Sequence, residues 1–166
     1  MYLYTRNYVS MIELWSLGKP DKKELAGPIA VYLERLTHYT KFEVVTIDNK
    51  RIPKNTTKEQ ILEKEAEIIA GRLQDRDLLV VLDEQGKEYS SIAFSEQLNQ
   101  WLNRSPNRII FLIGGSYGVA ASLRKKATSV ISLSKLTFPH QLVRLIFSEQ
   151  LYRAFTLLKN EKYHHE

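Results

Sequence analysis

Glycines follow a strongly apolar stretch near residue 110, in a pattern typical of a ligand-binding loop. Residues 109–113 are all apolar, and an unbroken apolar run of this length favours a parallel strand that is covered on both faces. Gly114, Gly115 and Gly118 come directly after it. Glycines let a ligand approach the backbone closely, and open α/β sheets bind ligands at the carboxyl ends of their strands.

A second loop of this kind lies between residues 133 and 139. It follows an expected short strand and contains small, hydroxyl-bearing and apolar residues up to Pro139. Together the two loops predict one pocket. The glycine spacing is not the dinucleotide fingerprint, and no Gly-Lys-Ser/Thr of a P-loop follows, so a purely structural glycine turn stays open. Asp83, at the end of another expected strand, is more often a turn residue than a ligand contact.

Composition sets outer limits on function. The chain has 166 residues and a net charge of +5, which suit one domain and permit, without requiring, an anionic partner such as nucleic acid. Cysteine is absent and the four histidines show no zinc spacing, so we expect no disulfide and no metal. There is no apolar run of about 18 residues and no signal peptide over residues 1–10. We therefore expect no membrane span and a cytoplasmic location.

Strand patterns and helix patterns alternate along the chain, which predicts an α/β fold with right-handed crossovers. Asp21 is the expected cap of the first helix, and Thr56 to Glu59 have the spacing of a capping box. The expected strands are 11–17, 42–47, 78–82, 109–113 and 130–133. The expected helices are 22–36, 56–73, 91–102, 120–127 and 140–159.

Basic residues group near the two loops and on the last helix. Arg124, Lys125 and Lys126 follow the glycines, and Arg144 and Arg153 lie on the last helix. A solvated helix face is the usual explanation of any single basic residue, but several groups close to one pocket favour phosphate contacts. The apolar stripe of the last helix indicates core packing that extends toward a subunit interface.

An ordered series of motifs carries a resemblance to a known family. The motifs are Leu82-Asp-x-x-Gly-Lys87, Phe111-Leu-Ile-Gly-Gly-x-x-Gly118, Leu133-Ser-x-Leu-Thr-Phe-Pro-His140, Leu142-Val-Arg144, Glu149-Gln-Leu-Tyr-Arg-Ala154 and Tyr163-His-x-Glu166. In this order they resemble the RlmH family, S-adenosylmethionine-dependent methyltransferases of the SPOUT class. The resemblance covers residues 11–166 as a single domain. Residues 1–10 lie outside the family pattern as an N-terminal extension.

The resemblance implies a fold, a reaction and partners. The implied fold is a mainly parallel sheet flanked by helices, with a C-terminal trefoil knot that no periodicity predicts. The implied reaction is methylation of N3 of a pseudouridine in 23S ribosomal RNA, at position 1915 of the standard rRNA numbering in helix 69. The assembled ribosome is the expected substrate, and a homodimer is the expected enzyme. By motif match, S-adenosylmethionine would bind Leu82, Gly114, Leu133, Ser134, Lys135, Leu136, Thr137 and Phe138.

The reaction also assigns roles to polar residues. The proton on N3 must leave, so a general base would help, and the candidates are His140, Glu149, His165 and Glu166. A cap of the last helix is an equally good role for His140. The expected RNA contacts are Arg124, Lys125, Lys126, Arg144, Arg153, Tyr163 and His164.

Two other functions remain open from the sequence. One is a non-catalytic protein that binds RNA or the ribosome through its basic face, with salt-dependent RNA binding and no affinity for S-adenosylmethionine. The other is a small NAD-binding oxidoreductase, against which the missing dinucleotide fingerprint argues.

Overall fold

The computed structural model describes residues 10–18, 23–49 and 52–163. Asp21, His164, His165, Glu166 and residues 1–9 lie outside the described residues, so the predictions made for them stay predictions. The same holds for the division of the chain into an extension at 1–10 and one domain at 11–166.

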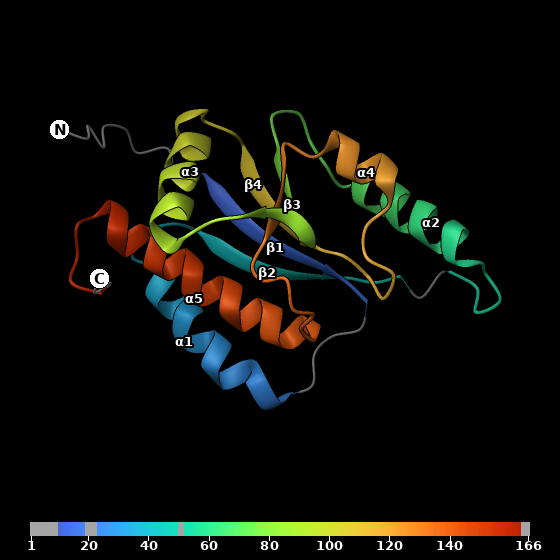
Figure 1. Ribbon diagram of the computed structural model, residues 1–166, viewed down its shortest axis with the longest axis horizontal. Coiled ribbons are helices and arrows are strands. Elements are labelled where there is room, and N and C mark those ends of the chain that lie inside the picture. The colour runs from blue at the N-terminus through green and yellow to red at the C-terminus, as the bar shows by residue number, and fades with distance from the viewer. Residues whose placement is uncertain (1–9, 19–22, 50–51, 164–166) are drawn as a thin grey trace.

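The described chain is built on one five-stranded parallel sheet (Figure 1). Its order is β2-β1-β4-β3-β5, with strands β1 (Met11–Leu17), β2 (Phe42–Ile47), β3 (Leu78–Glu88), β4 (Arg108–Ile113) and β5 (Ser129–Ser132). A parallel sheet places the carboxyl ends of all its strands at one edge. The predicted α/β fold with a parallel sheet is confirmed.

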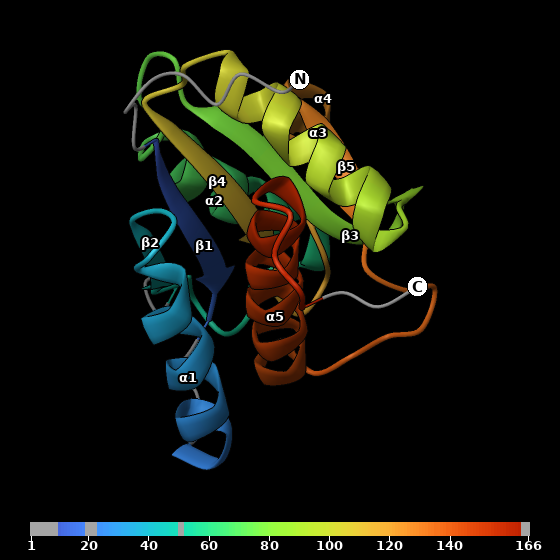
Figure 2. The same ribbon diagram turned by 90° about the vertical axis from the view of Figure 1, so that its left-hand side faces the viewer.

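Helices cover both faces of the sheet (Figures 1 and 2). They are α1 (Ala26–Leu36), α2 (Lys58–Ala70), α3 (Ser91–Asn103), α4 (Ala121–Lys126) and α5 (His140–Leu158). Side chains alternate between the faces, so that Ile12 and Leu14 of β1 join the core under α1, α3 and α5. Trp15 and Leu17 join the second core, under α2 and α4. This double cover explains why the central strands are apolar without interruption.

Three local predictions differ from the structure. The N-cap of α2 is Thr57, whose capping-box partner is Gln60, so the box predicted at Thr56 is wrong by one residue. α1 starts at Ala26 after a 3₁₀ turn at Lys23–Leu25, later than the predicted residue 22. Strand β3, predicted to end at residue 82, continues to Glu88 and resumes pairing with β5 at Lys87 after an irregularity. Sequence periodicity does not reveal an irregularity of this kind, because it depends on a distant strand.

Two global features concern membranes and the path of the chain. Within the described residues, 10–18, 23–49 and 52–163, no helix has both the length and the apolar character needed to cross a bilayer. The trefoil knot implied by the resemblance stays a prediction.

Candidate active site

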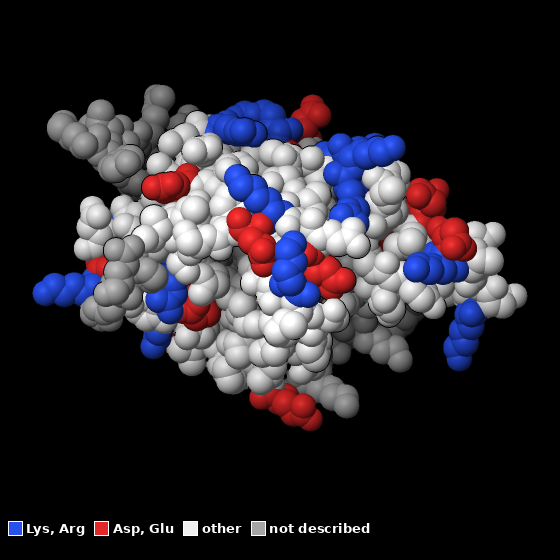
Figure 3. All heavy atoms as spheres, viewed as in Figure 1, with Lys and Arg blue, Asp and Glu red and all other residues white. Residues whose placement is uncertain are grey.

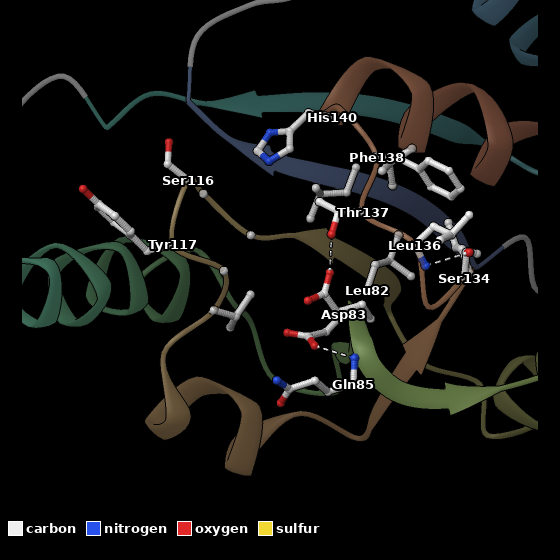
Figure 4. A pocket seen from close by; sticks show the side chains of 18 of the residues that line it. Leu82, Asp83, Gln85, Ser116, Tyr117, Ser134, Leu136, Thr137, Phe138 and His140 are labelled. Carbon is white, nitrogen blue, oxygen red and sulfur yellow. Dashed lines mark hydrogen bonds between the residues drawn. The ribbon is translucent and has the colours of Figure 1, made fainter.

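A cavity opens beside residues 82–85 of β3 and the carboxyl ends of β4 and β5, next to the first turn of α5 (Figure 4). Its volume of about 540 Å³ lies within the range of small-molecule sites. The glycine turn after β4 and the loop after β5 both line it, which agrees with the two-loop pocket expected from the sequence. Its lining includes Leu82, Gly114, Tyr117, Leu136, Phe138 and His140.

The turn at 114–118 is closed by its own backbone. The amide of Gly118 donates to the carbonyl of Gly115 at 3.0 Å, and Gly118 has a φ of +84°, which favours glycine. A Cβ on Gly114 would lie 2.5 Å from the carbonyl carbon and oxygen of Gly118. The tight turn therefore requires glycine at these positions, whatever ligand the cavity holds.

Hydrogen bonds fasten the loop at 133–138 to the end of β3. Lys135 Nζ donates to the carbonyl oxygens of Glu84 and Gly86 at 2.9 and 3.3 Å. Thr137 Oγ1 donates to Glu84 Oε2 at 3.0 Å, and the amide of Leu136 donates to Ser134 Oγ at 3.0 Å (Figure 4). The loop at 133–138 is therefore held against residues 84–86 of β3.

Both side-chain oxygens of Asp83, within β3, have partners in the protein. Its Oδ1 accepts from the amide of Gln85 at 2.9 Å, and its Oδ2 lies 3.4 Å from Arg124 Nη1. Arg124 thereby connects α4 to the end of β3 and also lines the cavity. Its guanidinium is partly neutralised by this ion pair.

The predicted cofactor residues lie together, with one exception. Leu82, Gly114, Leu133, Ser134, Leu136, Thr137 and Phe138 all line the cavity. Lys135 is not among the lining residues, because its side chain turns toward the carbonyl groups at the end of β3. Its role in the structure is to hold the loop.

The predicted catalytic residues lie at two separate places. His140 lines the cavity, and its ring extends from the start of α5 toward the glycine turn (Figure 4). Glu149 lies nine residues further along α5, which corresponds to about 13 Å of helix. There its Oε1 accepts from Arg153 Nη2 at 2.5 Å and from Tyr163 Oη at 3.3 Å.

The cluster of Glu149, Arg153 and Tyr163 is tightly paired. The hydrogen bond to Glu149 raises the pKa of Arg153. Burial, followed by hydrogen bonds and nearby charges, raises the pKa of Tyr163 to about 12. The Arg153 guanidinium lies 4.9 Å from the centre of the Tyr163 ring. Residue 163, the last described residue, is thus bound to α5.

The predicted RNA contacts are exposed only in part. Lys125 and Lys126 are exposed on α4, in a region where Figure 3 shows basic side chains gathered. Arg144 is 5% exposed and donates to Ser16 Oγ and Thr46 Oγ1 at the ends of β1 and β2. This burial argues against the phosphate contact predicted for Arg144, whose role here is to join α5 to the sheet.

Sequence reasoning missed two residues at the cavity rim, Lys58 and Tyr117. Tyr117 belongs to the glycine motif, but its exposure of 51% could not be read from that motif. Lys58 starts α2, and its Nζ lies 5.7 Å from the centre of the Tyr117 ring. No local pattern connects a helix start to a turn so far along the chain.

Comparison with known proteins identifies the family. The family described as predicted SPOUT methyltransferase matches residues 11–164. The chain is 51% identical to ribosomal RNA large subunit methyltransferase H of Christiangramia forsetii, over 93% of this chain and 98% of that protein. Proteins of the same name are 46% identical in Flavobacterium johnsoniae and 47% in Parabacteroides distasonis, each over 93% of this chain and 99% of the relative. These matches confirm the resemblance found in the motifs: the chain belongs to the SPOUT methyltransferases, in the family of ribosomal RNA large subunit methyltransferase H.

Proposed function

We propose that this chain transfers a methyl group from S-adenosylmethionine to N3 of a pseudouridine in 23S ribosomal RNA, at position 1915 in helix 69 of the assembled ribosome. The observation that carries the proposal is the cavity between the glycine turn and the loop at 133–138, in a chain whose relatives are named as methyltransferases of large subunit rRNA.

The cavity suits S-adenosylmethionine, the methyl donor that SPOUT membership implies. Leu82, Leu136 and Phe138 offer apolar surfaces for an adenine ring. Backbone groups beside Gly114 and Leu133 would bond its edge, as polar groups do in otherwise apolar sites.

The reaction makes modest demands on the side chains. When bound, S-adenosylmethionine supplies a methyl group that is already activated on a sulfonium. In the transfer the carbon–sulfur bond breaks, a carbon–nitrogen bond forms at N3, and the N3 proton leaves to a base. The main task of the residues is to align donor and acceptor. His140, which lines the cavity, is the described side chain that we propose as the proton acceptor.

Some of the residues predicted to act lie at the far end of α5 or beyond it. Glu149 and Tyr163 lie too far along the helix to reach the cavity that begins at His140 of the same chain. We propose that they serve the cavity of a second copy, so that the enzyme is a homodimer with shared sites. The tail residues predicted to act, His165 and Glu166, would follow Tyr163 into that cavity.

RNA would meet the rim of the cavity. Tyr117 offers a half-exposed ring on which an unpaired base can stack. Lys58, beside that ring, and the exposed Lys125 and Lys126 of α4 offer positive charge to the phosphates.

The test is transfer of labelled methyl from S-adenosylmethionine to ribosomes that lack the modification, followed by nuclease digestion and identification of the labelled nucleoside. N3-methylpseudouridine is the expected product. His140→Ala should suppress the transfer while the affinity for S-adenosylmethionine stays unchanged. Salt-dependent RNA binding without any transfer would contradict the proposal and favour a non-catalytic RNA-binding protein.

A further inference from the structure

Glu65 of α2 is a buried carboxyl group that lies directly behind the glycine turn. The residue is only 3% exposed. A Cβ built on Gly115 would lie 2.7 Å from both Glu65 Oε1 and Glu65 Oε2, so the carboxyl group packs against the backbone of Gly115. Gly115 itself lines the cavity. One backbone unit therefore separates this carboxyl group from the ligand site.

The two oxygens of Glu65 differ in their partners. Oε1 accepts from Asn49 Nδ2 at 2.7 Å, and Asn49 lies just after β2. Oε2 is buried and has no hydrogen-bond partner among the described residues. The carboxyl group thus joins α2, the end of β2 and the glycine turn. Its second oxygen, Oε2, is an unpaired acceptor beside that turn.

Packing alone does not explain this residue. Its neighbours on α2, Ala66 and Ile69, are apolar core residues, and an apolar side chain would fill the same position without a desolvation cost. Burial raises the pKa of Glu65, and the hydrogen bond from Asn49 only partly offsets this effect. A buried polar group with an unused acceptor calls for an explanation outside the ligand-free fold.

We propose that Glu65 is a positioning residue of the donor cavity: its Oε2 accepts a hydrogen bond from a backbone N–H of the 114–118 turn when the methyl donor is bound. Asn49 orients the carboxylate through Oε1. The hydrogen bond to Glu65 Oε2 then fixes the 114–118 turn on the side opposite the methyl donor. Oε2 accepts this hydrogen bond only when the donor is bound. This inference rests on the proposed function in one respect, the identity of the donor.

Glu65→Gln tests the proposal, because the amide keeps the shape of the side chain and replaces one acceptor by a donor. Calorimetric titration should show binding of S-adenosylmethionine weakened at least tenfold. The melting temperature of the ligand-free chain should stay the same or rise, because a buried ionisable group is removed. The matched control is Glu67→Gln, an exposed position of the same helix, which should change neither quantity.

The opposite pattern would overturn the inference. An unchanged dissociation constant together with a lower melting temperature would make Glu65 a purely structural residue. If the unmodified chain itself failed to bind S-adenosylmethionine, the assigned donor would be wrong instead, so the two failures are distinguishable.

A double-mutant cycle tests the contact itself. In Gly115→Ala the new methyl group would collide with the Glu65 carboxylate, and affinity for S-adenosylmethionine should fall. In the Glu65→Ala background the collision is absent, so the same glycine substitution should have a smaller effect. Equal effects in both backgrounds would show that Glu65 does not act through Gly115.

Discussion

At the scale of single residues, neighbouring protein atoms rather than a ligand require glycine at positions 114 and 115. Gly114 is confined by the carbonyl group of Gly118, and Gly115 by the carboxyl group of Glu65. A substitution at either position disturbs the wall of the cavity before it meets any ligand. Substitution of either glycine is therefore expected to affect ligand binding even though neither change adds a direct contact to the ligand.

Gly114→Ala should weaken S-adenosylmethionine binding, because the added methyl group would displace the turn that lines the cavity; overpacking of this kind also costs about 1–3 kcal/mol of stability. Calorimetric titration measures the effect. Gly27→Ala is the matched control, since nothing lies within 4 Å of a Cβ at that position. Alanine there should leave the affinity for S-adenosylmethionine unchanged. Equal affinities for the Gly114 variant and the parent would contradict the geometry of the turn.

Glu65 should also shape the dependence of stability on pH. Burial raises its pKa above the ordinary value of 4.5, so the folded chain retains this proton to higher pH than the unfolded chain. The stabilising contribution is fully present below pH 4.5 and is lost as the pH rises through the folded pKa. The stability of Glu65→Gln relative to the parent should therefore increase as the pH rises above 4.5. Denaturant titrations at several pH values measure this difference, and a constant difference would contradict it.

At the scale of elements, the start of α2 sets the position of both Lys58 and Glu65. The helix begins after Thr57, whose side chain accepts from the amide of Gln60, while the side chain of Gln60 accepts from the amide of Thr57. This reciprocal pair fixes the first turn of the helix. The cap therefore supports a rim residue and a residue behind the cavity at once.

Thr57→Ala should destabilise the chain by about 1 kcal/mol, the usual cost of losing an N-cap. Thr56→Ala is a close control, because Thr56 precedes the cap and the sequence pattern alone had favoured it. Urea denaturation of the two variants should show a loss for residue 57 and little change for residue 56. A larger loss of stability for Thr56→Ala than for Thr57→Ala would indicate that Thr56, not Thr57, is the N-cap of α2.

At the scale of the whole molecule, the sequence was a good guide to features set by local chemistry. Unbroken apolar runs located the central strands, and the glycines and the loop before Pro139 located the cavity. Long-range features were harder to foresee. The burial of Arg144 depends on hydroxyl groups of β1 and β2, and long basic side chains are rarely buried. Lys58 reaches the rim only because α2 and the glycine turn meet in space.

A shared active site predicts that two inactive chains can restore each other. One chain carries His140→Ala, and the other lacks residues 163–166. If the tail serves the cavity of the second copy, each mixed dimer has one site with both parts intact. An equal mixture should then recover about a quarter of the parent activity, assuming random pairing within a closed dimer.

Methyl transfer to ribosomes by the mixture measures this recovery. The separate chains, each kept at the same total concentration, are the controls. A mixture that stays inactive, although mixed dimers form, would show that the tail serves its own chain or no cavity at all.

The strand order has a consequence for synthesis of the protein. β1 lies in the interior of the sheet and pairs on one side with β4, a strand far along the chain: Met11 lies opposite Arg108. The nascent chain cannot complete this pairing until most of its length has left the ribosome, and such non-local pairing slows folding. The glycine turn and the loop at 133–138 emerge later still, and α5 emerges last. A chain released early would expose the apolar faces of β1 and β2, so its fate would be degradation or aggregation rather than partial activity.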